Sequence, residues 1–388
     1  MIRCNGPFFN GGDKLNCRYV ATCLFGLEKY LGEEIDALGY KRTETMDGRI
    51  IFEGDEGAAA RANVFLRMAE RVFLLLGDFR AESFTELFDG TKALPWSEFI
   101  GKNDAFPVKG HSVKSKLTSI PDCQKIVKKA IVDNLSAVYG ITSFPESGTK
   151  YQIEFFILRD RAMLMIDLSG MALHKRGYRP ESFEAPIRET LAACMVRISR
   201  PREDVLFWDP MCGSGTIAIE AAMMQNRIAP GKNRRFAAEE FPVFDGSLWR
   251  IAREEAAGNE RRTAFSVYAS DISEEAVRQT SDNIKRAGVE ETVKVFRRDA
   301  LTITTEGRRG TVVTNPPYGE RMFSAKETET LYRRMGEHFK TLDRWQIYII
   351  TSHPDFEKLY GRRADAKRRL YNGMIECCLY QYFKPQDK

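Results

Sequence analysis

The sequence predicts an α/β protein whose C-terminal half forms a doubly wound, mostly parallel sheet. From about residue 187 onward, short β-rich runs alternate with helical stretches, which is the pattern of repeated βαβ units. Three motifs follow directly after such runs, at the strand ends where these sheets bind ligands. The length of 388 residues exceeds what one hydrophobic core usually supports, so we expect two or three domains.

The N-terminal half predicts a separate region of mixed α/β structure. Runs rich in β-branched and aromatic residues alternate there with stretches of helical spacing. We expect strands at 19–25, 49–54, 72–79, 151–160 and 161–169, and helices at 26–38, 57–70 and 83–94. The Gly/Asn-rich start is expected to be loose, and the proline and glycine residues of 171–186 predict a linker.

The C-terminal half begins with a predicted helix at 187–199. We then expect helices at 216–225, 273–288 and 326–342, and strands at 205–209, 266–270, 293–298, 311–314, 346–351 and 377–383. Residues 227–262 interrupt the alternation and are interpreted as a long insertion.

The composition is that of an ordinary soluble protein, with 43% hydrophobic and 29% charged residues. No apolar run approaches the roughly 20 residues that span a bilayer, and the start lacks the apolar run of a signal peptide. The eight cysteines form no CxxC and the four histidines lie far apart, so we expect no metal site. A reducing cytoplasm fits, and the net charge of +5 argues only weakly for an anionic partner.

The first motif, at 209–216, reads Asp-Pro-Met-Cys-Gly-Ser-Gly-Thr and lies between a strand and a helix. Two glycines allow close approach of a ligand, and the helix start offers free N–H groups. The motif lacks the GK[ST] of a P-loop and the full GxGxxG pattern. By itself it is also compatible with an ordinary turn between a strand and a helix.

Two aspartates follow the next strands. A carboxylate at the position of Asp271 typically binds the ribose hydroxyls of an adenosine. Asp299 follows the third strand and is placed to accept from an adenine amino group. The alternative is that Asp271 only caps the next helix and that Asp299 belongs to a surface turn.

The strongest motif is Asn315-Pro316-Pro317-Tyr318 after the strand 311–314. Two prolines stiffen the turn, and the Asn315 side-chain oxygen and the Pro316 carbonyl can accept two hydrogen bonds from one NH2 group. Tyr318 offers a flat face for stacking a base taken out of its helix. This arrangement favours attack of an amine on an electrophilic methyl group.

Together these motifs resemble S-adenosylmethionine-dependent amino-methyltransferases. The longer string from LHKRGYR and APIRETLAA to DPMCGSGTIAIEAA and NPPYGER closely resembles the bacterial family of large-subunit ribosomal RNA guanine-N2 methyltransferases with an N-terminal THUMP domain. The resemblance extends from about residue 19 to residue 383. Some members continue into a second methyltransferase domain, and because this chain stops at Lys388 we expect that second activity to be absent.

The resemblance implies a Rossmann-like class I methyltransferase domain with a seven-stranded sheet, preceded by a ferredoxin-like and a THUMP α/β domain. It implies a loose N-terminus at 1–17, a ferredoxin-like part at 18–60, an RNA-binding THUMP domain at 45–168 with an overlapping boundary, a linker at 169–186, and the methyltransferase domain at 187–388. S-adenosylmethionine would be the cofactor and ribosomal RNA the partner, with no membrane and no metal involved. The oligomeric state is not predicted.

The resemblance also assigns site residues. The expected cofactor contacts are Thr190, Asp209, Met211, Cys212, Gly213, Ser214, Gly215, Asp271, Ile272, Asp299, Ala300 and Asn315. The catalytic turn would be Asn315, Pro316, Pro317 and Tyr318. Cys212 is not expected to be a nucleophile, because methylation of a pyrimidine carbon uses a cysteine where this chain has the NPPY sequence.

Basic residues are expected to deliver the RNA. Between residues 101 and 134, seven lysines oppose three aspartates. The candidates are Lys109, Lys114, Lys116, Lys125, Lys128 and Lys129, with Lys175 and Arg176 in the linker. From 357 to 371, six basic residues against two acidic ones form a second candidate patch. For each lysine the alternative is a solvated surface side chain.

Two alternatives to a guanine-N2 methyltransferase stay open at this stage. NPPY also occurs in adenine-specific methylases, so an N6-adenine methyltransferase acting on DNA or RNA would use the same catalysis; a THUMP-like N-terminal half favours RNA over DNA. The second alternative is a protein that binds RNA without catalysis. The intact Asp209, Asp271 and Asn315 argue against it.

Overall fold

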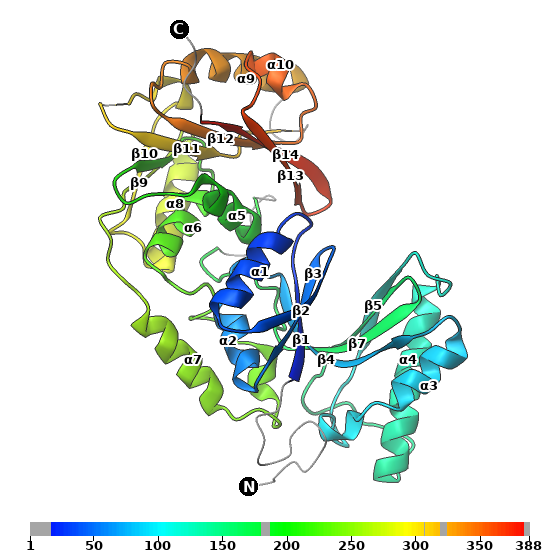
Figure 1. The fold of residues 1–388 in the computed structure, drawn as a ribbon. Helices are drawn as coiled ribbons and strands as arrows, with labels where there is room; N and C mark the ends of the chain where they lie inside the picture. The colour runs from blue at the N-terminus through cyan, green and yellow to red at the C-terminus, as the bar shows by residue number, and fades with distance from the viewer. Residues whose placement is uncertain (1–16, 180–186, 306, 319–323, 384–388) are drawn as a thin grey trace. The chain divides into compact units, whose positions relative to one another are not determined.

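The computed structural model describes residues 17–179, 187–305, 307–318 and 324–383 (Figure 1). Two compact units can be distinguished. Unit 1 contains Met1–Thr22, Gly32–Leu173 and Arg235–Glu255, and unit 2 contains Cys23–Leu31, His174–Arg234 and Ala256–Lys388. The predicted insertion is therefore divided, because its part at Arg235–Glu255 packs with the N-terminal unit. Among the described helices none is long and apolar enough to cross a bilayer.

Unit 1 is built on one seven-stranded sheet with the order β2-β3-β1-β4-β7-β6-β5. Its strands are β1 (Cys17–Thr22), β2 (Lys41–Met46), β3 (Arg49–Gly54), β4 (Arg71–Arg80), β5 (Val108–Val113), β6 (Ile153–Leu158) and β7 (Arg161–Asp167). Its helices are α2 (Gly57–Phe65), α3 (Phe84–Lys92), η1 (Trp96–Glu98), α4 (Ile120–Tyr139) and η2 (Ala237–Glu240). Two further helices, α1 (Glu28–Ala37) and α7 (Ser247–Gly258), run across the boundaries of the units.

Unit 2 holds the predicted doubly wound sheet, with the order β10-β9-β8-β11-β12-β14-β13. Its strands are β8 (Leu206–Asp209), β9 (Val267–Asp271), β10 (Val293–Arg297), β11 (Gly310–Thr314), β12 (Gln346–Thr351), β13 (Ala366–Asn372) and β14 (Ile375–Tyr382). Its helices are α5 (Glu189–Ser199), α6 (Thr216–Gln225), α8 (Glu274–Ala287), η3 (Ala300–Thr302), α9 (Ala325–Phe339) and α10 (Phe356–Tyr360). Strands β8 to β12 pair in parallel, and β14 runs antiparallel to both of its neighbours.

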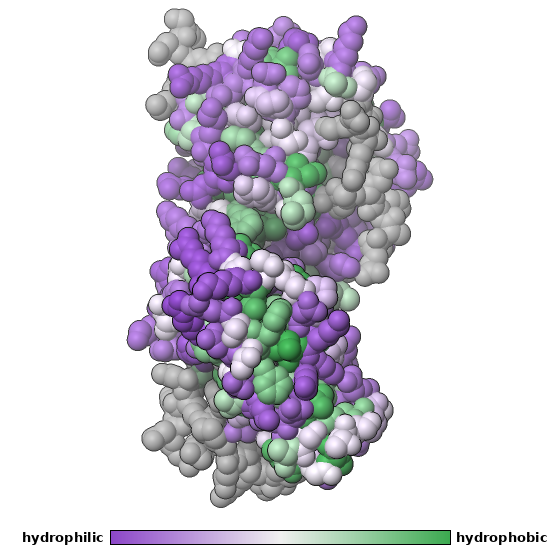
Figure 2. Space-filling model, turned by 90° about the vertical axis from the view of Figure 1, so that its right-hand side faces the viewer, coloured by the Kyte–Doolittle hydropathy of each residue, from purple (hydrophilic) through white to green (hydrophobic). Residues whose placement is uncertain are grey.

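Helices cover both faces of this sheet. Figure 1 shows α5, α6 and α8 on one face and α9 with α10 on the other. The core between the sheet and the helices α9 and α10 contains large aromatic side chains, among them Trp208 of β8, Tyr332 of α9 and Phe356 of α10. Because these helices bury both faces of the central strands, only the strand ends are left for a ligand. At the surface drawn in Figure 2, hydrophilic residues predominate and hydrophobic ones are scattered among them.

Some sequence predictions of single elements were wrong. Strands β2, β5 and β13 and helix α4 were not predicted, and α2 ends at Phe65 and not at residue 70. The segment that was expected to be a linker is not exposed throughout, because Arg176 and Tyr178 are buried in unit 2. Strands β2 and β13 are mostly polar, with sequences KRTETM and AKRRLYN, and therefore lack the apolar alternation that predicts a strand.

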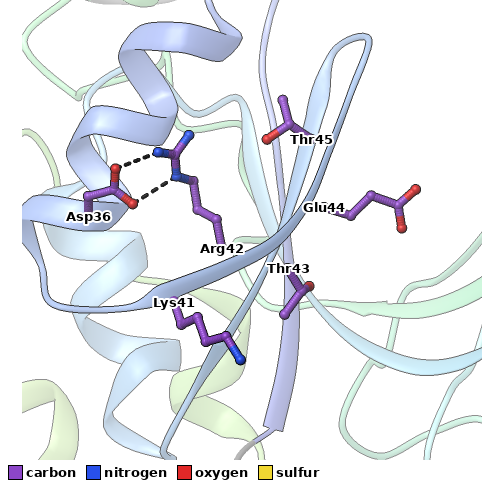
Figure 3. A pocket seen from close by; sticks show the side chains of 6 residues that line it. All are labelled: Asp36, Lys41, Arg42, Thr43, Glu44 and Thr45. Carbon is purple, nitrogen blue, oxygen red and sulfur yellow. Dashed lines mark hydrogen bonds and ion pairs between the residues drawn. The ribbon is translucent and has the colours of Figure 1, made fainter.

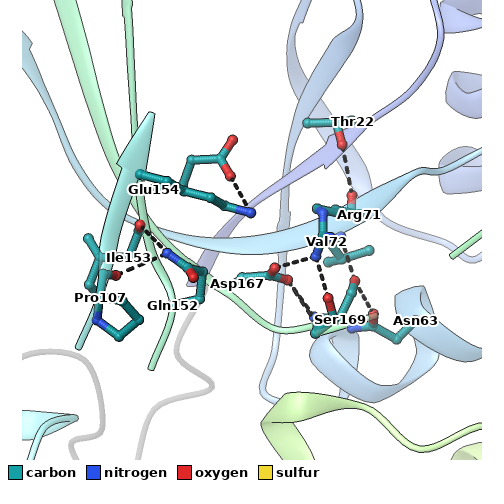
Figure 4. A network of polar contacts seen from close by, with 12 residues as sticks. Thr22, Asn63, Arg71, Val72, Pro107, Gln152, Ile153, Glu154, Asp167 and Ser169 are labelled. Carbon is teal, nitrogen blue, oxygen red and sulfur yellow. Dashed lines mark hydrogen bonds and ion pairs between the residues drawn. The ribbon is translucent and has the colours of Figure 1, made fainter. Parts of the chain in front are cut away.

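A buried polar network joins β4, β7 and α2 inside unit 1 (Figure 4). The hydroxyl of Ser169 accepts a hydrogen bond from the Val72 N–H at 2.8 Å and donates to the Asn63 side-chain oxygen at 2.6 Å. Asp167 accepts from the Ser169 N–H at 2.9 Å and forms an ion pair with Arg71. Burial raises the pKa of Asp167, and the positive charge of Arg71 opposes this shift. The network stabilises the end of β7 against β4 without leaving these groups unpaired.

We expect Ser169→Ala to lower the unfolding free energy by about 2 to 3 kcal/mol, because the buried Val72 N–H and Asn63 oxygen both lose their partner. Urea unfolding of the full chain measures this effect through the transition midpoint. Ser147→Ala, at an exposed serine of the same unit, is the control and should leave the midpoint in place. Equal midpoints for the two variants would show that the network contributes no net stability.

Candidate active site at the strand ends

The predicted site residues lie at the carboxyl ends of four neighbouring parallel strands. Asp299, Asp271, Asp209 and Asn315 follow or end β10, β9, β8 and β11, which are adjacent in that order. The register pairs Asp209 with Ala269 and Arg297 with Asp271. The direction of the strand order reverses between β8 and β11, which is the place where open α/β sheets form a ligand crevice.

The glycine turn after β8 is shaped by helix α8. Gly213 and Gly215 have φ angles of +52° and +80°, which favour glycine. The Thr280 hydroxyl donates to the Gly213 carbonyl at 2.7 Å, and the Asn283 amide donates to the Ser214 carbonyl at 2.9 Å. These bonds occupy the carbonyl groups on the α8 side of the turn. Thr280 and Asn283 were not predicted as site residues, although they are polar residues three positions apart on the buried side of a predicted helix.

Asp271 connects the same turn to the start of α8. Its Oδ2 accepts from the Gly213 N–H at 3.0 Å, and its Oδ1 accepts from the Ser273 N–H at 2.9 Å. The N-cap of α8 is Ser273, whose hydroxyl accepts from the Ala276 N–H at 3.3 Å. Asp271 is therefore not the capping residue itself. The neighbouring Ile272 is 61% exposed and presents an apolar surface beside this carboxylate.

Asp209 is buried between the ends of β8 and β11. Its side chain accepts from the Thr314 hydroxyl at 3.0 Å and from the Met211 N–H at 3.3 Å. Burial raises the pKa of Asp209 to about 7, and the negative charge of Asp271 adds to this shift. Beside it, burial raises the pKa of the Cys212 thiol, and the Cys212 side chain is only 6% exposed. A thiol that is kept protonated and covered is a poor nucleophile.

The Asn315–Tyr318 turn is held from two sides. The Tyr332 hydroxyl of α9 donates to the Pro317 carbonyl at 3.0 Å, and the Asn372 amide of β13 donates to the Tyr318 hydroxyl at 3.1 Å. The Asn315 side-chain oxygen is shielded from solvent and has no hydrogen-bond partner among the described residues. Tyr332 and Asn372 were not predicted as site residues, because nothing in the local sequence pattern indicates which distant side chain reaches the turn.

The remaining predicted contacts lie around these groups. Asp299 accepts from the Leu301 N–H at 2.9 Å and caps the short helix η3, and Ala300 beside it is buried. Thr190 is fully buried in the first turn of α5. The structure brings the glycine turn, Asp271 and Asn315 to one edge of the sheet, and the contact of each with a cofactor stays a prediction.

Arg176 does not belong with the expected RNA contacts. Its side chain is 1% exposed and forms an ion pair with Glu220, so it has no surface to offer to a phosphate. Arg179, missed by the sequence analysis, forms an ion pair with Glu189 at 2.7 Å and donates to the hydroxyl of Thr216, the first residue of α6. These two arginines fasten residues 174–179 to the helices that follow.

The predicted basic residues of unit 1 lie on β5, on α4 and in the loop between them. Lys114, Lys116, Lys125 and Lys129 are exposed, whereas Lys109 and Lys128 are half-buried. Acidic side chains form ion pairs with four of the six: Glu154 with Lys109, Glu82 with Lys116, Asp122 with Lys125 and Glu146 with Lys128. Local carboxylates therefore neutralise part of the charge that the composition suggested. Lys175 of unit 2 is exposed.

Other candidate sites are weak. A hollow of about 380 Å³ in unit 1 is lined by polar residues of β2 and by Asp36 (Figure 3). Arg42 points to Asp36 there and forms two hydrogen bonds with it, at 2.6 and 2.7 Å, so its guanidinium is already satisfied within the chain. Within the described ranges, no group of three or more His, Cys, Asp or Glu residues is arranged to hold a metal ion.

The reversed strand order, the glycine turn and the polar strand ends define a Rossmann-like unit with a ligand site at its strand ends. Comparison with known families agrees. Residues 176–381 match the RMKL-like methyltransferase domain, residues 18–73 the RlmL ferredoxin-like domain, and residues 81–167 the THUMP domain. The chain belongs to the RMKL-like methyltransferase family. The expected combination of three α/β domains is thereby confirmed.

Three similar proteins illustrate the family. The chain is 43% identical over 377 residues to a putative RNA methyltransferase, YpsC, of Bacillus subtilis, covering 95% of this chain and 97% of that protein. It is 33% identical to the ribosomal RNA large subunit methyltransferase K/L of Psychromonas ingrahamii, covering 92% of this chain but only 49% of that longer protein. The solved structure of SMU.472, a putative methyltransferase complexed with SAH, is 40% identical, with a TM-score of 0.88 over 97% of this chain and all of that one. The complex with SAH agrees with S-adenosylmethionine as the expected cofactor.

We expect the burial of Asp209 to make stability depend on pH. Its folded-state pKa of about 7 lies above the ordinary 3.8, so the folded chain binds a proton that the unfolded chain has lost. The contribution is therefore complete below the ordinary pKa and is lost as the pH rises toward 7. Between about pH 5 and pH 8, the unfolding free energy of the wild type should fall by about 2 to 3 kcal/mol relative to Asp209→Asn.

Chemical unfolding of both proteins across this pH range measures the difference. Asp343→Asn, at an aspartate with an 89% exposed side chain, is the control and should follow the wild type at every pH. Parallel profiles for wild type and Asp209→Asn would contradict the expected titration.

Proposed function

We propose that this protein uses S-adenosylmethionine to methylate the exocyclic N2 amine of a guanine in large-subunit ribosomal RNA. The observation that carries the proposal is the Asn315 side-chain oxygen, a buried acceptor without a partner in the described part of the chain. Leaving such an acceptor unpaired costs about 1 to 3 kcal/mol, so its retention at a strand end suggests a partner in the substrate. An NH2 group of a base supplies the missing donor.

The residues around the glycine turn fit the cofactor. Gly213 and Gly215 let a ligand approach the backbone closely, and the Asp271 carboxylate can accept from ribose hydroxyls. The exposed Ile272 offers an apolar face for an adenine ring. When bound, S-adenosylmethionine supplies a methyl group that its positively charged sulfur has already activated.

The protein then contributes position and polarity. The lone pair of a guanine N2 is delocalised into the ring. When the Asn315 side-chain oxygen accepts a hydrogen bond from the N2 amine, it favours positive charge on that nitrogen as it attacks the methyl group. The Pro317 carbonyl already accepts from Tyr332, so we assign the second acceptor to the Pro316 carbonyl. Asn372 holds the Tyr318 hydroxyl and thereby orients a ring on which the base stacks.

The THUMP domain and the names of the relatives support RNA as the substrate class. YpsC and the K/L enzyme are both named as acting on RNA, and the K/L name specifies the large ribosomal subunit. An N6-adenine target is the alternative, because an amide oxygen can accept a hydrogen bond from either exocyclic amine. Identification of the methylated base distinguishes the two.

We expect Asn315→Ala to lower the single-turnover rate of methyl transfer by about 10²-fold, because a preorganised acceptor at the reacting nitrogen is lost. Cofactor affinity should change little, since the glycine turn and Asp271 remain. The assay uses deproteinised ribosomal RNA and identifies the product base by mass spectrometry, with calorimetry for the cofactor. Asn103→Ala, at an exposed asparagine of unit 1, is the control. Full activity in Asn315→Ala, or methyl groups on a pyrimidine carbon, would defeat this mechanism.

The six predicted lysines of unit 1, between 109 and 129, are called the lysine cluster. We expect Lys114 and Lys129 to contact RNA phosphates, since both are exposed and neither is among the four lysines of the cluster that form ion pairs. Changing both to Glu should weaken RNA binding and reduce the slope of log affinity against log salt by about one per lysine. The control changes the exposed Lys41 and Lys340 to Glu, which alters the net charge equally. Salt titrations of the full chain on ribosomal RNA compare the pairs, and equal slopes would refute a specific role of the cluster.

A further inference from the structure

The hairpin of β13 and β14 presents two exposed apolar side chains at its end. Asn372 pairs with Ile375, so only Gly373 and Met374 form the turn, and Gly373 has a φ of +66°. Such a two-residue turn with glycine in first place is tight and matches the twist of the strands. Met374 is 97% exposed and Ile375 49% exposed. We call residues 372–375 the hairpin tip.

The hairpin tip is fastened to the proposed catalytic turn. The Asn372 amide donates to the Tyr318 hydroxyl at 3.1 Å, and the Cys377 thiol contacts the same oxygen at 3.8 Å. Both residues lie within three positions of Met374 along the hairpin. The exposed methionine is therefore held near the ring on which the target base is proposed to stack.

Further apolar and basic groups lie along β13. Phe25 is 54% exposed and contacts the ring of Tyr371 edge-to-face at 5.8 Å. Because side chains alternate along a strand, Lys367 and Arg369 lie on one face of β13, and Arg368, which donates to the Tyr30 hydroxyl at 2.8 Å, lies on the other. Between 357 and 376 six basic residues oppose three acidic ones. The ion pairs of Lys367 with Glu357 and of Arg369 with Glu376 involve exposed lysine and arginine side chains. Exposed pairs of this kind are weak and can exchange a carboxylate for a phosphate.

We propose that Met374 and Ile375 enter the RNA base stack next to the target nucleotide and fill the place from which its base is taken. Removal of a base from a helix costs stacking energy, and proteins that distort nucleic acids insert Met, Ile, Leu or Phe between bases to offset that cost. The basic residues of β13 identify the occupant as nucleic acid, because an apolar tip alone would suit a protein partner equally well. This inference rests on the proposed function.

The test is single-turnover methyl transfer to deproteinised ribosomal RNA by the full chain carrying Met374→Ala and Ile375→Ala together. We expect the maximal rate to fall about tenfold or more, with little change in the RNA concentration that gives half-maximal rate. Cofactor affinity by calorimetry should be unchanged, which shows that the variant is folded. Met374→Leu should keep most of the rate because the tip stays apolar, and Met171→Ala, at a methionine of unit 1 that is 55% exposed, is the matched control.

The outcomes separate this inference from the proposed function. A wild-type rate in the double variant would overturn the role of the hairpin tip while leaving the methyltransferase function intact. Absence of methyl transfer to RNA by the wild type would overturn both. Sedimentation of wild type and variant gives the remaining outcome: a dimer formed only by the wild type would show that a second copy of the chain covers the tip, which also overturns the proposal.

Discussion

The candidate site depends on the parallel pairing of β8 with β11. Their hydrogen bonds join Leu206–Trp208 to Gly310–Val312, segments about a hundred residues apart in the sequence. One consequence is that the glycine turn after β8 and the Asn315 turn after β11 leave the sheet side by side. Beyond the last paired residues, Trp208 and Val312, the Thr314 hydroxyl donates a hydrogen bond to the buried Asp209 and connects the two strand ends. A shift in register would separate the groups proposed to bind the methyl donor from those proposed to bind the amine.

Side chains from the surrounding helices then fix the shape of both turns. Thr280 and Asn283 occupy carbonyl groups of the glycine turn, and Tyr332 occupies the Pro317 carbonyl. Each of these bonds removes an acceptor that would otherwise need water, and each restricts the backbone. The Asn315 side-chain oxygen has no partner in the described part of the chain, and it is the acceptor that we propose for the substrate.

The sequence allowed the C-terminal sheet and its strand-end motifs to be predicted, because buried parallel strands such as VLFWD and TVVT are short, apolar and followed by conspicuous turns. It did not allow β2 or β13 to be predicted, because polar strands resemble loops. Arg176 was expected to contact RNA because of its charge alone. Only the structure shows that its ion pair with Glu220 is buried. Contacts such as that of Asn372 with Tyr318 arise from tertiary packing, for which no local pattern exists.

The continuity of the unit 1 sheet limits how this architecture can be taken apart. Strands that match the ferredoxin-like domain and strands that match the THUMP domain belong to one hydrogen-bonded sheet. The two sets are joined where β4 pairs with β7 from Phe73 to Arg80. Cutting the chain between the two would expose an unpaired edge on each piece, and such edges promote aggregation. Unit 1 also includes Arg235–Glu255, which come from within the methyltransferase sequence, so a piece that ends before that sequence would lack part of unit 1. The sequence modules can therefore be recognised separately, but they are not separately exchangeable parts.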